Sequence, residues 1–348
     1  MQLGRYELGS ILGVGGMAEV FKAHYASPGG VRRTVVVKRI LPTFSRDPQF
    51  VKMFVAEAQL LGLLHHPNVV QAHDFGEADG TLFLVLEYVD GPSVSEAMST
   101  LRRLNQKMPL IAAAYFTREV CRALDHVHSL KGSDGEPLNV IHRDVTPANI
   151  VLTKEGGVKL LDFGVAKYRA SQAHTVEGTV KGKPAYLAPE ALEGKRIDSR
   201  VDLFSLGIVL HEMLTLKGLF ESDNQVVTFR KILELPIAPP STLRPSVPAE
   251  LDAIVMKALE RDPARRYQTA GEMADDLDRY LTLGGLNVDH IATFVGGLVA
   301  RKAPELPRIP SVASQYAPTI AASAPARRDE GGRWLGRLGR FLSRKPPS

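Results

Sequence analysis

Three polar side chains in two neighbouring stretches have the types and the spacing that phosphoryl transfer requires. Asp144 and Asn149 belong to His142-Arg143-Asp144-Val145-Thr146-Pro147-Ala148-Asn149, and Asp162 follows thirteen residues after Asn149. One carboxylate can accept the proton of an attacking hydroxyl, while the other oxygen atoms can hold Mg²⁺ on nucleotide phosphates. Because Asp and Asn also crowd ordinary turns, these residues need support from the rest of the chain.

A glycine-rich turn lies between predicted strands near the N-terminus. Residues 6–8, 12–21 and 34–38 are predicted strands, and Gly13, Gly15 and Gly16 would let the backbone approach phosphates. Dinucleotide sites also use glycines, but there the turn leads from a strand into a helix. Residues 19–24 have strand character instead, which disfavours the dinucleotide alternative.

Lys38 ends an apolar strand, where an unpaired ammonium would be costly. Glu57 lies nineteen residues further on, in a stretch (50–61) with helical apolar spacing. A carboxylate from that helix could pair with Lys38 and direct it at phosphate oxygens. The alternative is a Glu57 that faces solvent, as most helical glutamates do. The other motifs favour the pair.

Seven motifs in this order resemble the eukaryotic-type protein kinase family, and in particular its bacterial Ser/Thr branch. They are the glycine turn, Val36-Val37-Lys38, Glu57, His142-Arg143-Asp144, Asn149, Asp162-Phe163-Gly164 and Ala188-Pro189-Glu190. The resemblance covers about residues 6–281, with further helix to about residue 300. It implies an α+β, protein kinase-like two-lobed fold, with a β-rich N-lobe over residues 1–89 and a mainly helical C-lobe over residues 90–300.

The resemblance also implies the site. Lys38 would hold the α- and β-phosphates of ATP with Glu57 as its partner, and Asp144 would orient and deprotonate the acceptor hydroxyl. Asn149 and Asp162 would bind Mg²⁺, with Mn²⁺ as the alternative metal. The glycine turn would contact the phosphates through Gly13, Gly15 and Gly16. Apolar side chains would enclose the adenine ring, namely those of Leu12, Val20, Val36 and Val151. The backbone of Glu87 and Val89 would contact the edge of the adenine. The third family glycine is Ala18 here.

Two departures from the family pattern occur together. Thr146 stands where most Ser/Thr kinases have lysine, and Lys183 stands where the family usually has threonine before the Ala-Pro-Glu triplet. In the family these positions lie together beside the catalytic Asp. We therefore hypothesise a reciprocal swap, in which Lys183 supplies the cation and Thr146 the hydroxyl. The alternative is a solvent-exposed Lys183 and a site that works without that charge.

Arg143, next to Asp144, predicts control by phosphorylation, because a guanidinium there can pair with a phosphate on the following loop. The candidate phosphosites are Thr175 and Thr179, whereas Ser171 is read as an ordinary loop residue. The resemblance further implies that buried Asp202 anchors the catalytic loop and that Glu190 pairs with Arg266.

Charge and composition limit the other classes. The net charge of +5 is concentrated after residue 300, where ten basic and three acidic residues give +7; the first 300 residues carry −2. A nucleic-acid partner is therefore not expected.

The single cysteine, Cys121, lies in a helical stretch and is predicted to be a core thiol in a reducing compartment. With no run of 18 apolar residues and no signal-like segment, a cytoplasmic protein is expected.

After residue 300 the chain turns to Pro, Ala and Ser, which predicts a disordered linker over residues 301–332. Residues 333–348 follow, and within them 333–345 would place Trp334, Leu338 and Phe341 on one helical face and arginines on the other. Such a segment could lie on the inner membrane surface or dock on a partner. A disordered basic tail is an equal alternative, since two glycines weaken the helix.

The sequence thus predicts a kinase that transfers the ATP γ-phosphate to protein Ser/Thr hydroxyls. It would also act on itself, through a transient homodimer. The signatures of tyrosine specificity are absent around residues 146–149 and 183–187. A nucleotide-binding pseudokinase scaffold is the alternative that Thr146 keeps open. A small-molecule kinase is disfavoured by the phosphorylatable loop and the intact Ala188-Pro189-Glu190.

Overall fold

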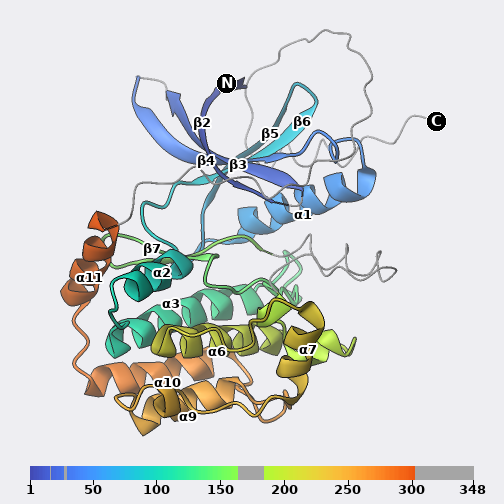
Figure 1. The fold of residues 1–348 in the computed structure, drawn as a ribbon. Helices are drawn as coiled ribbons and strands as arrows, with labels where there is room; N and C mark the ends of the chain where they lie inside the picture. The colour runs from blue at the N-terminus through green and yellow to red at the C-terminus, as the bar shows by residue number, and fades with distance from the viewer. Residues whose placement is uncertain (16, 27–29, 164–183, 302–348) are drawn as a thin grey trace. The chain divides into compact units, whose positions relative to one another are not determined.

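A computed structural model describes residues 1–15, 17–26, 30–163 and 184–301. The predictions on Gly16, Thr175, Thr179 and Lys183, and those on residues 302–348, lie outside these ranges. Over the described residues the chain forms two compact units, an N-lobe of Met1–Gln59 with Ala72–Tyr88 and a C-lobe of Leu60–Gln71 with residues 89–301. A β-rich first unit and a mainly helical second unit confirm the predicted fold class (Figure 1).

The N-lobe contains one antiparallel sheet in the order β1-β2-β3-β4-β6-β5. Its elements are β1 (Gln2–Leu3), β2 (Tyr6–Val14), β3 (Ala18–Ala26), β4 (Arg32–Ile40), α1 (Pro48–Leu63), β5 (Ala72–Ala78) and β6 (Thr81–Glu87). The prediction of one strand over residues 12–21 is wrong, because residues 12–14 end β2 and Ala18 begins β3, with Gly13 paired to Val20 across the ladder. The glycine turn therefore follows Val14 and ends before Ala18.

The strand register places the side chains of the sheet on two faces, one that forms the N-lobe core and one that carries Lys38. Val35 and Val37 are buried in one cluster with Phe21 and Val85, so this face makes the N-lobe core. Side chains alternate along a strand, which puts Val36 and Lys38 on the other face. Cross-strand partners share a face, so Val20 and Leu84 flank Lys38, and Leu86 flanks Val36.

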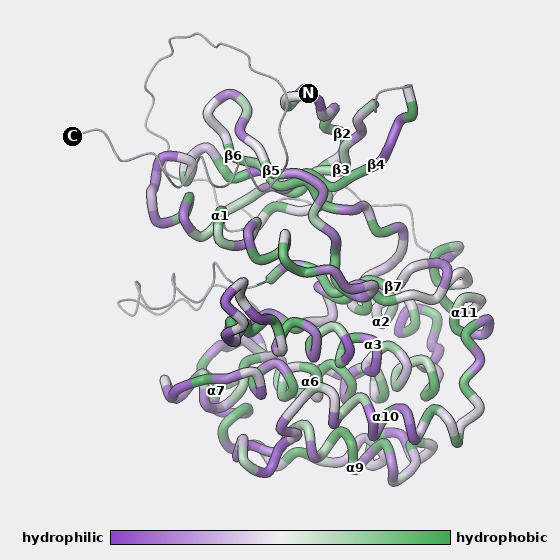
Figure 2. Tube along the Cα trace, turned by 180° about the vertical axis from the view of Figure 1, so that it is seen from behind, coloured by the Kyte–Doolittle hydropathy of each residue, from purple (hydrophilic) through white to green (hydrophobic). Residues whose placement is uncertain are grey.

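The C-lobe is organised around α6 (Arg200–Thr215), in which every residue from Val201 to Leu214 is buried. The other helices among the described residues are α2 (Val94–Arg103), α3 (Leu110–His128), η1 (Pro184–Tyr186), α5 (Pro189–Leu192), α7 (Gln225–Glu234), α8 (Pro240–Leu243), α9 (Ala249–Ala258), α10 (Ala270–Leu283) and α11 (Val288–Ala300). Helix α3 packs against both α6 and α10 and buries Cys121, as predicted for a core thiol. Green and purple segments alternate along α3 and α10, as expected of helices with one buried face (Figure 2).

A short hairpin of β7 (Ile150–Leu152) and β8 (Val158–Leu160) completes the C-lobe. It joins the loop that holds Asp144 and Asn149 to Asp162, so both ends of the hairpin carry predicted site residues. The strand β7 lies so close to Gly91 that a Cβ there would overlap the carbonyl oxygen of Leu152. Within the described ranges no single helix is long and apolar enough to cross a membrane; α10 and α11 pass that test only as a pair bent by 99°.

Candidate active site

The Lys38 ammonium and the Glu57 carboxylate form an ion pair in the N-lobe, with Nζ 2.6 Å from Oε1. Glu57 is only 3% exposed and Lys38 15%, so the predicted pair is present and a solvent-facing Glu57 is excluded. Truncating one member of such a pair leaves an uncompensated charge away from water. The pair therefore fixes the Lys38 amine on the face of the sheet opposite the apolar core.

The other predicted nucleotide residues of the N-lobe lie around this pair. Val20 and Val36 are half-buried neighbours of Lys38 and Leu86 on that face. Leu12 is half-buried on β2, and Glu87 ends β6. The glycine turn closes through a hydrogen bond from the Gly15 N–H to the Ala18 carbonyl, 2.8 Å long.

Ala18, which replaces the third glycine of the family pattern, lies outside the glycine turn. It is the first residue of β3, is 6% exposed and pairs with Ile40. Its methyl group is therefore part of the packed sheet, and the turn itself keeps its glycines.

In the C-lobe, Asp144 and Asn149 are in direct contact. The Asn149 side-chain amide donates to the backbone carbonyl of Asp144 at 2.9 Å and to its Oδ2 at 2.7 Å. The Asn149 N–H donates to the Thr146 carbonyl, 3.0 Å away, which closes the loop. With its nitrogen turned to Asp144, the Asn149 amide keeps Oδ1 as its acceptor atom, and an amide oxygen is a suitable metal ligand.

Asp202 anchors the backbone of this loop. Its carboxylate accepts hydrogen bonds from the N–H groups of His142 and Arg143 and from Nε2 of His128, each 2.8 Å long. Burial by itself would raise the pKa of Asp202. The hydrogen bond from His128, the nearby imidazoles and the Arg143 N–H outweigh burial and lower that pKa below its ordinary value.

The His142 ring joins the two loops that carry the predicted carboxylates. Its Nδ1 accepts the Asp144 N–H at 3.2 Å, and its Nε2 donates to the Leu161 carbonyl at 2.9 Å, so the ring is the neutral Nε2–H tautomer. Burial lowers the pKa of His142, although Asp202 and Asp144 oppose the shift. Each ring nitrogen therefore holds the backbone directly beside a candidate functional carboxylate, Asp144 or Asp162.

Backbone strain occurs at the same place. Arg143 has φ of 65° and Asp162 has φ of 44°, in the left-handed region that L-residues rarely adopt. Such strain persists only where surrounding contacts impose it, and it concentrates at functional sites. Here the Asp202 hydrogen bond holds Arg143, and the tilted contact of the Phe163 ring with His142, with ring centroids 4.6 Å apart, holds the residue after Asp162.

Asn149 and Asp162 fit a magnesium ion by donor type, because both offer hard oxygen atoms. Over the part of the chain that the structure describes, no group of three or more His, Cys, Asp or Glu residues could hold a metal alone. Mg²⁺ commonly uses one or two protein oxygens and completes its shell with substrate phosphates and water. The donor set thus suits a metal that arrives with a nucleotide.

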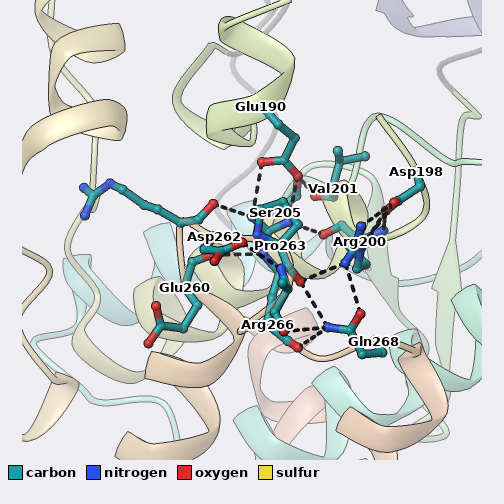
Figure 3. Close-up of polar contacts among 12 residues, drawn as sticks. Glu190, Asp198, Arg200, Val201, Ser205, Glu260, Asp262, Pro263, Arg266 and Gln268 are labelled. Carbon is teal, nitrogen blue, oxygen red and sulfur yellow. Dashed lines mark hydrogen bonds and ion pairs between the residues drawn. The ribbon is translucent and has the colours of Figure 1, made fainter. Parts of the chain in front are cut away.

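The predicted pair of Glu190 and Arg266 is also present (Figure 3). The guanidinium contacts both carboxylate oxygens, at 2.8 and 3.2 Å, and further donates to the backbone carbonyls of Arg200 and Glu260. The Arg266 side chain is fully buried. This network ties the Ala188-Pro189-Glu190 segment to the start of α6 and to the loop after α9.

Sequence reasoning missed two supporting contacts. His128 donates to Asp202, and Tyr186 donates through its hydroxyl to buried Glu212 at 2.7 Å. The second histidine of His126-Val127-His128, at a helix end, was a weak signal for the first contact. The second contact joins residues 26 positions apart, and nothing local marks it.

Comparison with known proteins places this geometry in a family. The protein kinase domain family matches residues 6–276. This chain belongs to that family. Its fold resembles the crystal structure of the Mycobacterium tuberculosis PknI kinase domain, with 28% identity and a TM-score of 0.59 over 80% of this chain and 97% of that one.

Longer kinases are similar to the chain in sequence. The tyrosine-protein kinase MasK of Myxococcus xanthus is 38% identical over 93% of this chain and 51% of its own length. The serine/threonine-protein kinase PknB of Mycobacterium tuberculosis is 41% identical over 79% of this chain and 42% of its own length. The chain thus spans about half, or less, of these kinases. Membership of the kinase family implies, in general terms, use of ATP with a divalent metal and protein substrates.

Proposed function

We propose that the protein is a serine/threonine protein kinase that transfers the γ-phosphate of ATP, bound with Mg²⁺, to hydroxyl groups of proteins and of itself. The observation that carries this proposal is the contact of Asn149 with Asp144, on a loop anchored through His142 and Arg143 to Asp202. This contact supports an active enzyme over a pseudokinase scaffold, because it holds both the Asp144 carboxylate, which would accept the proton, and the Asn149 amide, which would bind the metal.

In this proposal each half of the site has a separate task. Lys38, held by Glu57, neutralises the α- and β-phosphates, while Leu12, Val20, Val36 and Val151 enclose adenine. Val89 and Glu87 offer backbone groups to the adenine edge. Asn149 and Asp162 would hold Mg²⁺, which would supply positive charge to the phosphoryl group when bound. Asp144 takes the proton of the acceptor hydroxyl.

Tyrosine specificity is the second candidate, and the similarity to MasK favours it. We give priority to Ser/Thr because PknB is similar at higher identity and the tyrosine signatures are absent from this chain. Phosphoamino acid analysis after incubation with labelled ATP tests the choice. Phosphoserine and phosphothreonine are expected. Phosphotyrosine alone would transfer the proposal to tyrosine.

The swap of Thr146 and Lys183 remains part of the proposal. Thr146 is buried in the catalytic loop and only 4% exposed. Its hydroxyl can therefore form hydrogen bonds only with groups of that loop or with a side chain that enters the loop. Lys183→Ala is expected to lower kcat while leaving the melting temperature unchanged. If kcat is unaffected in Lys183→Ala but lost in Lys38→Met, the swap is wrong.

Activation by phosphorylation of Thr175 or Thr179 also remains a proposal, supported by Arg143 beside Asp144. A Thr175→Ala/Thr179→Ala variant is expected to lag behind wild type from the first minute of the assay, because neither phosphate can form. Equal initial rates, with Ser171→Ala as the matched control, would exclude this switch.

The outer parts of the chain complete the proposal. We assign residues 1–89 and 90–300 to the two lobes, 301–332 to a linker, and 333–345 to contact with a membrane surface or a partner.

Autophosphorylation would proceed in a transient homodimer of a cytoplasmic protein. Mixing Asp144→Asn with tagged wild type tests the dimer step: label on the inactive chain supports transfer between copies, and its absence contradicts it.

A further inference from the structure

Helix α11 lies beyond the residues that define the family, since the kinase domain match ends at residue 276 and α11 spans Val288–Ala300. It is nevertheless a well-built helix. The Asn287 side chain caps it by accepting the N–H groups of Asp289 and His290. Ile291, Val295 and Leu298 are all buried, and their spacing of four and three residues gives one apolar face toward the C-lobe.

At its first turns α11 lies against the turn of the β7–β8 hairpin. Gly156 has φ of +86°, and a Cβ at that position would lie 3.1 Å from the Ala292 nitrogen. The Gly156 N–H donates to the Thr153 carbonyl and the Gly157 N–H to Thr153 Oγ1, which makes the turn compact. Two strands of three residues are marginal by themselves, so such a hairpin depends on what packs against it.

At its other end α11 contacts the end of α2. Arg103 donates to the Arg301 carbonyl at 2.8 Å, and Arg301 donates to Gln106 Oε1 at 3.4 Å. Figures 1 and 2 both show α11 beside β7 and α2. The start of α2 in turn holds the catalytic loop, because the Ser95 N–H donates to the Pro147 carbonyl at 2.9 Å.

We propose that α11 is a brace that positions the metal-binding residues Asn149 and Asp162. One end supports the hairpin that connects these two residues, and the other supports the helix that holds the loop before Asn149. Releasing the brace widens the range of spacings between the two oxygen donors, so metal binding weakens while the fold persists. This inference rests on the proposed metal role of Asn149 and Asp162.

Gly156→Ala tests the brace with a closely matched control. Gly135 has φ of +82°, sits in a comparable turn with its N–H on the Gly132 carbonyl, and has nothing within 4 Å of an added Cβ. Gly156→Ala and Gly135→Ala should cause similar backbone strain, because both positions have positive φ. Only Gly156→Ala also places a methyl group against α11. A second pair is Val295→Ala, at a fully buried position of α11, with Val299→Ala, 37% exposed, as its control.

The readout is the Mn²⁺ affinity of the full chain with a non-hydrolysable ATP analogue, measured by electron paramagnetic resonance beside kcat and melting temperature. We expect Gly156→Ala and Val295→Ala to weaken Mn²⁺ binding by about threefold or more. This is less than the change of about 10–100-fold that follows loss of a direct contact with a metal ligand, because both residues act through the hairpin and α11. Excess metal should restore kcat. Both control variants should bind as wild type does.

Two results separate the failure of the brace from the failure of the proposed function. If Asp162→Asn abolishes Mn²⁺ binding but Gly156→Ala and Val295→Ala bind as wild type does, whatever their melting temperatures, the brace is wrong. If Asp162→Asn itself binds Mn²⁺ as wild type does, the proposed metal role fails and takes the brace with it.

Discussion

The Asn149 side chain holds Asp144 at two points, donating to its backbone carbonyl at 2.9 Å and to its carboxylate at 2.7 Å. The same side chain is thus both the restraint on the proposed base and a proposed metal ligand. In this account one residue couples the orientation of the acceptor hydroxyl to the place of the metal, so its loss should affect both.

Asn149→Ala should therefore lower kcat/KM by about 10²-fold or more, the loss typical when one aligned polar group is removed from a catalytic centre. Because Asn149 is only half-buried, we expect little change in melting temperature. Steady-state kinetics and a thermal melt of the same preparation check both statements. A wild-type rate would show that the contact with Asp144 is incidental.

Lys38→Met should abolish activity and also destabilise the N-lobe, because it leaves the Glu57 carboxylate, 3% exposed, without its ion-pair partner. The double variant Lys38→Met/Glu57→Leu should regain stability but not activity. Lys52→Met, at an exposed position of α1, is the matched control and should resemble wild type. If the double variant is active, the amine has no catalytic task.

Arg266→Ala should lower the free energy of unfolding by about 3–5 kcal/mol, the usual loss when one partner of a buried ion pair is removed. Its neighbour Arg265 has a side chain that is 70% exposed, so Arg265→Ala should stay within about 0.5 kcal/mol of wild type. Urea unfolding compares the two. Equal stability of the two variants would contradict the structural importance of the Glu190 contact.

Stability should fall as the pH drops from about 7 towards 5. Burial lowers the pKa of folded His142, whereas an unfolded histidine has a pKa of about 6.5. Below that pH the unfolded chain takes up a proton that the folded ring does not, so protonation favours unfolding. Burial also lowers the pKa values of His66 and His211, which act in the same direction.

His142→Gln isolates the contribution of this ring, since its amide offers a donor and an acceptor but does not titrate. The loss of unfolding free energy between pH 7.5 and pH 5.5 should be smaller in the variant than in wild type. Urea unfolding at the two pH values measures it, and an equal loss in both proteins would contradict a buried neutral His142.

Much of the fold followed from local signals. Alternating apolar residues around Lys38 predicted a strand, helical spacing around Glu57 predicted α1, and the cost of an unpaired lysine predicted their contact, which is 2.6 Å long. The family resemblance supplied the contacts of Asp202 and of Glu190 with Arg266. The strand limits differ from the prediction. Strand β2 continues through Gly13, because pairing with Val20 outweighs the low strand propensity of glycine.

The rest depends on tertiary contacts that no local pattern encodes. The His142 ring connects the Asp144 N–H to the Leu161 carbonyl, and His128 reaches Asp202 from 74 residues away. The contact between α11 and the β7–β8 turn likewise joins Gly156 to Ala292. Each is a meeting of two segments that the sequence places far apart, so only the folded chain reveals it.

The measurement that bears most directly on the central claim is phosphate transfer from ATP by wild type and by Asp144→Asn, with the phosphorylated residues mapped by mass spectrometry. Removing a general base typically lowers the rate by about 10²–10⁴-fold. Wild type should therefore label Ser and Thr, including Thr175 or Thr179, while Asp144→Asn stays nearly silent with an unchanged melting temperature. Equal labelling by both proteins would contradict the assigned base. Silence of both, with a melting temperature raised by ATP, would establish a nucleotide-binding scaffold in place of a kinase.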